Sequence, residues 1–249
     1  MSFLLTDPFY LGSILKSLDL ESTLYFNIEN NLNIECLFQN SSFFSIKLPL
    51  YRVNTYGSFF IALKDLIYTI DLFGLFSKSD KLILCFSTSK YGEVMTVSSN
   101  RVSAFNLSFE ISLLIEENFS PKIPITNIPM AKLMASSNTF LKIFQSDILN
   151  SYESVSCTIE EDYLKIYGND EFGKGLIQIR INGFRSLEIH RPNEKNVGFL
   201  IERRQLLLIT SMFLKTDYCN ISIRPNDIEF NCTKNTIEDE IINITIKIS

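Results

Sequence analysis

Two periods of hydrophobic and polar residues alternate along this 249-residue chain, and they predict amphipathic helices that are each followed by a group of strands. A first helix is predicted after Asp7-Pro8, because a capping side chain followed by proline is typical of a helix start. Its apolar face is formed by Leu11, Ile14, Leu15 and Leu18. Strands are then predicted at about Thr23 to Glu29, Asn33 to Phe38 and Phe43 to Leu48.

A second helix is predicted at about Ile61 to Phe73, where apolar residues recur at helical spacing on one side. These residues are Leu63, Leu66, Ile67, Ile70 and Phe73. The helix is expected to end at Gly74, since glycine best tolerates the left-handed conformation at a helix exit. Further strands are predicted near Lys81, Glu93 and Arg101.

The periodic pattern is lost between Glu116 and Met130, and three prolines explain why. Pro121, Pro124 and Pro129 each lack an amide donor and restrict the preceding residue, so they cannot share one regular element. This segment is therefore predicted to be a linker, residues 118–130, between a domain of residues 1–117 and a domain of residues 131–249.

Beyond the linker the same plan begins again. A helix at about Ser136 to Gln145 buries Phe140, Ile143 and Phe144, and a helix at about Glu202 to Leu214 follows a polar loop from Asn182 to Asn196. Strands are predicted at about Ser154 to Ile159, Tyr163 to Gly168 and Gly173 to Ile181, and the last strand alternates Ile242, Ile244, Ile246 and Ile248 with polar residues.

Each half thus reads as helix, strands, helix, strands, and such repetition indicates an architecture built from copies. The fold class that follows is α+β, with two helices on a mostly antiparallel sheet, twice in tandem.

Composition and charge disfavour several classes of protein. The net charge of −5 disfavours a protein that binds nucleic acid through bulk positive charge, so any DNA contact must be local. No apolar run reaches the roughly 18 residues of a membrane helix, and the start of the chain lacks the basic residues of a secretory signal. The five cysteines form no Cys-x-x-Cys pair and are interpreted as reduced packing residues.

Catalytic chemistry is poorly supported. The one histidine, His190, lies in the predicted polar loop without an evident nucleophile beside it, and Gly168 to Gly175 lacks the spacing of a phosphate-binding loop. Three acidic clusters fall where turns should connect strands: Glu160-Glu161-Asp162, Asn169-Asp170-Glu171 and Glu238-Asp239-Glu240. We expect no catalytic residue, metal or cofactor, and a metal-dependent 3′-5′ exonuclease using the acidic turns is the enzymatic alternative.

Two stretches resemble a known family. The run from Leu66 to Gly74, followed by Leu82 to Phe86, is similar to the corresponding run of the Rad-one subunit of the heterotrimeric DNA-damage checkpoint clamp. Cys219 to Arg224 resembles a strand late in the same subunit. On these runs and the tandem plan, the chain is identified as a member of the sliding-clamp superfamily, whose members are proliferating cell nuclear antigen-like.

The resemblance implies two tandem sliding-clamp (DNA clamp) domains in a non-enzymatic, nuclear subunit. Three such subunits would close a ring around double-stranded DNA. The implied partners are Rad-nine and Hus-one type clamp subunits, an ATP-driven clamp loader, and checkpoint kinase and repair factors. The alternatives are a replication sliding clamp that acts as a polymerase processivity factor and a viral clamp-like processivity factor.

A clamp that slides should touch phosphates weakly, through exposed helix faces that line the hole. The candidate DNA-binding residues are Lys16, Lys64, Lys142, Arg203, Arg204 and Lys215. Each could equally be only solvated. Asp65 and Asp71 share the second helix with Lys64, so the lining is expected to be only modestly basic.

Subunits of clamps join by pairing edge strands, and two strands suit that role. The candidate interface residues are Leu107, Phe109, Ile111 and Leu113 in the first half and Ile177, Ile179 and Ile181 in the second. The same alternation also fits ordinary core strands. In the linker, Ile123, Ile125 and Ile128 are candidates for a partner-peptide groove, or they anchor the loop.

Overall fold

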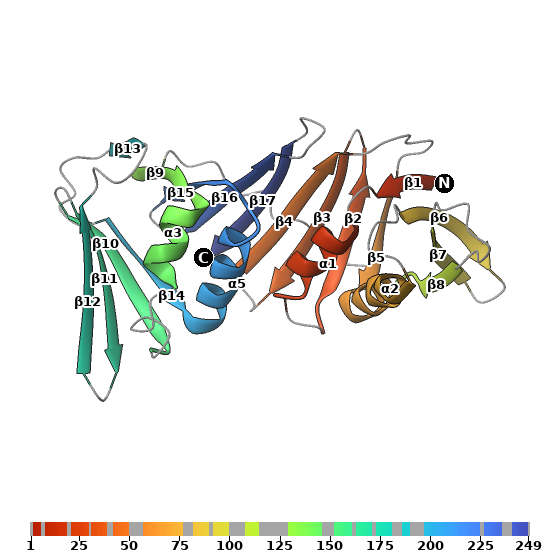
Figure 1. Ribbon diagram of the computed structural model, residues 1–249, viewed down its shortest axis with the longest axis horizontal. Coiled ribbons are helices and arrows are strands. Elements are labelled where there is room, and N and C mark those ends of the chain that lie inside the picture. Colours follow the sequence, from red (N-terminus) through yellow and green to blue (C-terminus); the bar gives the residue numbers. More distant parts are fainter. Residues whose placement is uncertain are drawn as a thin grey trace. The chain divides into compact units, whose positions relative to one another are not determined.

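The computed structural model describes most of the chain and divides it into two units (Figure 1). The described residues are 2–5, 8–18, 21–29, 31–38, 42–49, 57–76, 82–89, 92–99, 108–114, 129–145, 152–160, 163–170, 173–180, 186–189, 197–224, 227–235 and 241–248. Unit 1 comprises Met1–Asn40 and Ser45–Lys122, and unit 2 comprises Ser41–Phe44 and Ile123–Ser249.

In its described part, unit 1 contains two helices, and its strands belong to two sheets. Its elements are β1 (Ser2–Leu5), α1 (Pro8–Leu15), β2 (Thr23–Ile28), β3 (Asn31–Phe38), β4 (Ser42–Pro49), β5 (Gly57–Ala62), α2 (Leu63–Phe76), β6 (Leu82–Ser89), β7 (Gly92–Ser99) and β8 (Ser108–Ser112). One sheet has the order β1-β6-β7-β8, and the other includes β4-β3-β2-β5.

The core of unit 1 forms where α1 and α2 pack together and turn their apolar faces inward. All the residues predicted for these two faces are buried. They are Leu11, Ile14, Leu15 and Leu18 on and just after α1, and Leu63, Leu66, Ile67, Ile70 and Phe73 on α2. Gly12 permits the close approach of the helices, because a Cβ at this position would lie 3.0 Å from Ile70 Cγ2. The predicted helix faces are therefore confirmed.

Unit 2 repeats this plan. Its elements are β9 (Ala131–Ser136), α3 (Ser137–Phe144), β10 (Ser154–Glu160), β11 (Tyr163–Asp170), β12 (Gly173–Arg180), β13 (Ser186–Ile189), β14 (Val197–Glu202), α5 (Arg203–Phe213), β15 (Tyr218–Ile223), β16 (Ile228–Asn235) and β17 (Ile241–Ile248). One sheet has the order β12-β11-β10-β14, and the other includes β13-β9-β15-β16-β17.

Phenylalanine rings join the helices of unit 2 to its sheet. The ring of Phe213 on α5 lies 5.6 Å from Phe140 and 5.9 Å from Phe144 on α3, and 6.3 Å from Phe230 on β16. Burying aromatic rings of this size contributes much of a core's stability. The alternating isoleucines of β17 are buried beneath the same layer, as the sequence predicts.

The structure confirms the α+β class and adds strands that the sequence pattern did not separate. Helix α2 begins directly after β5, α3 after β9 and α5 after β14, with no loop between strand and helix. The plan is therefore strand, helix, strands, and the predicted start of the second helix at Ile61 belongs to β5.

Two further predictions about local structure are wrong. Helix α2 continues through Gly74 to Phe76, because a glycine inside a helix costs only about 1 kcal/mol and Leu75, a good helix former, follows it. The predicted polar loop contains strand β13, whose residues Ser186 to Ile189 pair with Met134 to Ala131 of β9. Backbone pairing with β9 outweighs the polar character of the flanking sequence.

Four cysteines, Cys36, Cys157, Cys219 and Cys232, are buried free thiols. The linker isoleucines, Arg101 and His190 lie outside the described residues. In the described part of the chain, no helix combines the length and the apolar character needed to cross a membrane.

Candidate functional site

The exposed side of α2 carries both signs of charge. Lys64, Asp65 and Asp71 are exposed, and Tyr68 between them is 67% exposed. The burial of the opposite side explains this arrangement, since the helix must turn its apolar stripe toward the sheet. The predicted basic residue Lys64 is therefore accessible, but two carboxylates share its surface.

Lys16, in the turn after α1, pairs with a carboxylate of α2. Its Nζ lies 2.6 Å from Asp71 Oδ1, and about half of each side chain is exposed. An ion pair in this setting stabilises a protein by only about 0–1 kcal/mol, since water screens it. The pair nevertheless neutralises the charge that Lys16 would offer to an anion.

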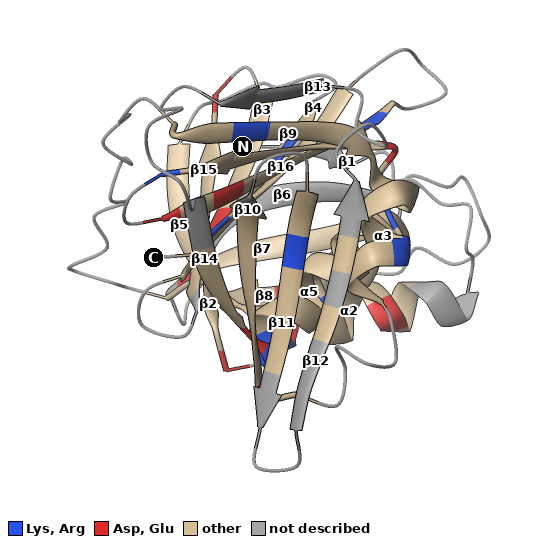
Figure 2. Cartoon of the chain, turned by 90° about the vertical axis from the view of Figure 1, so that its left-hand side faces the viewer, with Lys and Arg blue, Asp and Glu red and all other residues tan. Residues whose placement is uncertain are grey.

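The basic residues of unit 2 have a different setting. Lys142 on α3 and Arg203 and Arg204 at the start of α5 are exposed, and their side chains make no ion pair or hydrogen bond among the residues described. Lys215, just after α5, is half-buried and contacts other groups. Figure 2 colours the lysines and arginines blue and the acids red along these elements.

Helix α5 is fixed at its first turn by one of its own side chains and by a backbone carbonyl just before β10. The Glu202 backbone N–H donates to Gln205 Oε1 at 2.8 Å, and the Arg203 N–H donates to the Glu153 carbonyl at 2.8 Å. Two of the amide donors that a helix start leaves without intrahelical partners are thus satisfied. The side chains of Arg203 and Arg204 are therefore held on an anchored turn.

Strand β8 lies at one end of its sheet in the described part of unit 1. The Leu113 N–H donates to the Glu93 carbonyl at 3.1 Å, and hydrogen-bonded pairs alternate along an antiparallel ladder. The backbone groups of Ser108, Glu110 and Ser112 therefore point away from β7, toward an edge that has no partner strand among the described residues except at its end, where the Leu114 N–H donates to the Phe60 carbonyl at 2.9 Å. Their side chains are exposed as well.

Two of the predicted interface residues of this strand, Phe109 and Ile111, face inward. Ile111 is buried, and the ring of Phe109 lies 5.3 Å from that of Phe73 on α2 in an edge-to-face contact. Leu113 is half-buried, and Leu107 lies outside the described residues. The side chains of Phe109 and Ile111 pack into unit 1, so any strand pairing at this edge would use the backbone.

Strand β12 ends the other four-stranded sheet, in unit 2. It pairs with β11 from Tyr163 opposite Arg180 to Asp170 opposite Gly173. Leu176 is 54% exposed, and Gln178 is exposed too. Ile177 and Ile179 lie in the strand, while Ile181 is outside the described residues. Each unit thus presents one end strand where the sequence places a candidate interface.

Two of the three acidic clusters begin at the ends of paired strands. Glu160 pairs with Tyr163 where β10 turns into β11, and Asp170 pairs with Gly173 where β11 turns into β12. Within the described ranges, no group of three or more His, Cys, Asp or Glu side chains gathers as metal ligands would. The third cluster and the remaining acidic turn residues lie outside those ranges.

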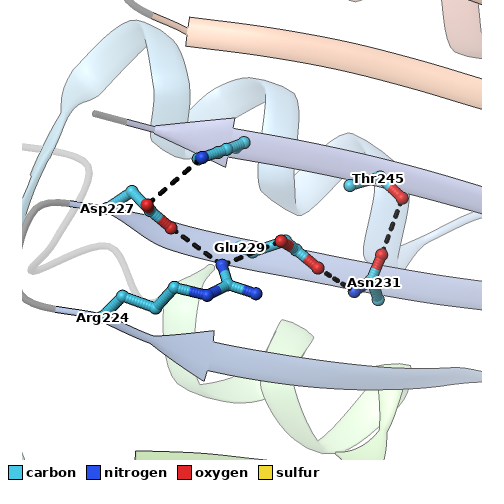
Figure 3. Close-up of polar contacts among 6 residues, drawn as sticks. Arg224, Asp227, Glu229, Asn231 and Thr245 are labelled. Carbon is cyan, nitrogen blue, oxygen red and sulfur yellow. Dashed lines mark hydrogen bonds and ion pairs between the residues drawn. The ribbon is translucent and has the colours of Figure 1, made fainter. Parts of the chain in front are cut away.

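Sequence reasoning missed a polar cluster on β16 and β17 and in the turn between β15 and β16 (Figure 3). Arg224 Nη1 donates to Asp227 Oδ1 at 2.8 Å and to Glu229 Oε2 at 2.9 Å, and Lys247 Nζ lies 3.2 Å from Asp227 Oδ2. Each of these four side chains is only 11–14% exposed. The alternation of β16 and β17 indicates that their polar residues share the face opposite the buried isoleucines. It does not indicate that the charged side chains form ion pairs with one another.

The cluster is internally satisfied. Asn231 Nδ2 donates to Glu229 Oε1, and Thr245 Oγ1 donates to Asn231 Oδ1 at 2.7 Å. Burial opposes the charge of Arg224, but hydrogen bonds and the charges of Asp227 and Glu229 outweigh it and raise the pKa of the guanidinium. The two positive and two negative charges balance, so the cluster offers no net attraction to a charged ligand.

Comparison with known proteins bears on the fold. No protein-family model matches the chain, and no curated protein sequence does. A chain of the PCNA2–PCNA3 complex of Sulfolobus tokodaii is similar in structure, with a TM-score of 0.74 and 16% identity over 99% of this chain and 98% of that one. Proliferating Cellular Nuclear Antigen of Entamoeba histolytica has a TM-score of 0.76 and 14% identity over 100% and 97%. The chain therefore has the two-domain sliding-clamp fold.

Proposed function

We propose that this protein is a non-enzymatic subunit of a ring-shaped sliding clamp that encircles double-stranded DNA. The observation that carries the proposal is the tandem fold in which a four-stranded sheet of each unit ends in a candidate interface strand, β8 in unit 1 and β12 in unit 2, because a subunit that joins two neighbours needs two such edges. Head-to-tail pairing of unlike edges closes a ring when the rotation between subunits allows it.

The helices suit the same role. Exposed basic side chains on helices neutralise phosphates without reading bases, and the chain's net charge of −5 keeps that attraction local. Retention on DNA would then come from topology, and the weak phosphate contacts would permit sliding. The double-stranded DNA is bound without regard to sequence.

Within this class we assign the subunit to the DNA-damage checkpoint. The runs Leu66 to Gly74 and Cys219 to Arg224, which resemble the Rad-one subunit, support that assignment. The subunit would assemble with Rad-nine and Hus-one type partners in the nucleus. A clamp loader would place the ring, which would then recruit checkpoint kinase and repair factors.

A replication clamp is the second candidate, and the names of the structural neighbours favour it. Both neighbours are described as proliferating cell nuclear antigens, and one was solved as a complex of two different clamp chains. A replication clamp of this kind would serve a DNA polymerase as processivity factor.

The mass of the protein in solution tests both candidates. We expect light scattering on a sizing column to give a 28.6 kDa monomer that joins a stable one-to-one-to-one complex when co-expressed with Rad-nine and Hus-one type subunits. A homotrimer formed alone would support the replication clamp. A monomer that joins no clamp subunit would overturn the clamp proposal.

The enzymatic alternative has its own test. Purified protein should not degrade duplex or single-stranded DNA in the presence of Mg²⁺ or Mn²⁺. Degradation that requires the divalent ion and is lost on replacing Glu160, Glu161 and Asp162 with alanine would instead establish an exonuclease.

A further inference from the structure

Building on the proposed clamp function, we propose that phosphate contact is unequal between the two units. The helices of unit 2 make the main contacts, through Arg203, Arg204 and Lys142. In unit 1, Asp71 acts as a limiting residue that withholds Lys16 from DNA. The ligand class is the phosphate backbone of duplex DNA.

The helices differ in charge. Helices α1 and α2 together contain one lysine and two aspartates, a net charge of −1. Helices α3 and α5 together contain one lysine, two arginines and no acid, a net charge of +3, which the exposed Glu202 just before α5 reduces to +2. A polyanion is attracted to the second pair of helices and not to the first.

The ion pair in unit 1 strengthens this difference. Lys16 Nζ, 2.6 Å from Asp71 Oδ1, must leave that carboxylate before it can bind a phosphate oxygen. A phosphate near Lys16 would also approach the negative charge of Asp71. Lys64, the other basic residue here, is next to Asp65 and lies two helical turns from Asp71 on the same exposed side.

The basic side chains of unit 2 are available for binding. Arg203 and Arg204 are exposed, and no ion pair within the described residues engages their guanidinium groups. A guanidinium can give two parallel hydrogen bonds to one phosphate, which a lysine cannot. Beyond Arg204, α5 contains no charged residue, and Leu207, one turn further along, is 54% exposed and apolar, so the charged contacts of α5 are confined to its first turn.

The test is the salt dependence of binding to a fluorescein-labelled, blunt 30-base-pair duplex, measured by anisotropy with the whole protein. Each lost phosphate contact should reduce the slope of log affinity against log salt by about 0.9. We expect Arg203→Gln with Arg204→Gln to reduce the slope by about 1.8 and Lys142→Gln by about 0.9. Lys64→Gln should change it by less than half a unit.

Asp71→Asn isolates the limiting residue. It should increase affinity and make the slope steeper by about one contact, because Lys16 becomes free to bind phosphate. Adding Lys16→Gln to Asp71→Asn should remove that gain if Lys16 carries it. A gain that persists without Lys16, or no gain at all, would overturn the role assigned to Asp71.

The remaining outcomes separate this inference from the clamp proposal. A reduction of the salt slope for Lys64→Gln as large as that for the two arginine substitutions would overturn the inequality between units. The absence of any salt-dependent DNA binding would overturn it as well. If the slopes follow the expected order but the protein never assembles with clamp subunits, the inference holds and the clamp function fails.

Discussion

The chain holds charged side chains in two contrasting places, the Arg224 cluster on the sheet of unit 2 and the Lys16–Asp71 pair between the helices of unit 1. In the cluster, four side chains that are 11–14% exposed hold one another through several contacts. In the pair, two side chains that are about half exposed share a single contact.

This difference separates structural charges from functional ones. Removing one member of a nearly buried ion network leaves its partners without compensation, whereas water takes over at once when an exposed pair is broken. The Arg224 cluster should therefore matter for stability and little for binding. The Lys16–Asp71 pair should matter little for stability and, in our proposal, much for DNA contact.

Replacing the central arginine should have the largest effect. Arg224→Ala removes the donor shared by Asp227 and Glu229 and should lower the free energy of unfolding by about 2–4 kcal/mol. Urea denaturation followed by circular dichroism measures the change. Arg204→Ala is the matched control, since this exposed arginine has no partner among the described residues and should change stability by under about 0.5 kcal/mol. Equal losses for both variants would contradict the structural role of the cluster.

Glu35 is a third case, a partly buried carboxylate that no cation pairs with among the described residues. Glu35 Oε2 on β3 is buried and has no hydrogen-bond partner among the residues described, and burial raises the pKa of this carboxyl. The folded state then disfavours the charged form. The resulting loss of folding stability therefore appears as pH rises through the ordinary glutamate range, and it persists above that range.

Glu35→Gln should accordingly raise the free energy of unfolding at pH 7 by less than about 1 kcal/mol, since the group is only partly buried. The gain should vanish below about pH 4, where the unfolded-state carboxyl is protonated as well. Thermal unfolding across pH 3–8 measures it, with the exposed Glu110→Gln as control. A gain that is independent of pH would point to packing instead of charge.

The exposed pair should have the smallest effect on stability. Lys16→Ala breaks the contact with Asp71 and should change the free energy of unfolding by about 0.5 kcal/mol or less. The same denaturation assay measures it, at low and at high salt. A loss above about 1.5 kcal/mol would show that the pair holds α1 against α2.

The sequence predicted the helix faces well, because an apolar stripe at helical spacing depends only on local order. Leu66, Ile70 and Phe73 are buried as their spacing indicates. The sequence pattern did not predict the boundary where a strand runs directly into a helix. The pattern of Phe59 and Ile61 is alternating in β5, but the helical spacing that follows overlaps it and concealed the boundary.

The ion pairs could not be predicted from the sequence for a different reason. Arg224 and Lys247 are far apart along the chain, and only the register of β15, β16 and β17 brings both to Asp227. Lys16 and Asp71 likewise meet only because α1 packs on α2. The pattern identified which residues are exposed, and tertiary structure decided which of them are neutralised.

Assembly through the open edge of β8 can be tested with one pair of variants. Glu110→Pro removes an amide that points away from β7, so it should leave the sheet of unit 1 intact while blocking a strand from adding to the edge. Glu110→Ala keeps the amide and serves as the control. We expect light scattering to find that the proline variant fails to form the trimeric assembly of the unaltered chain, alone or with its clamp partners, while its unfolding temperature stays within about 5 °C of the alanine variant. A proline variant that assembles as fully as the control would contradict joining of subunits through this strand.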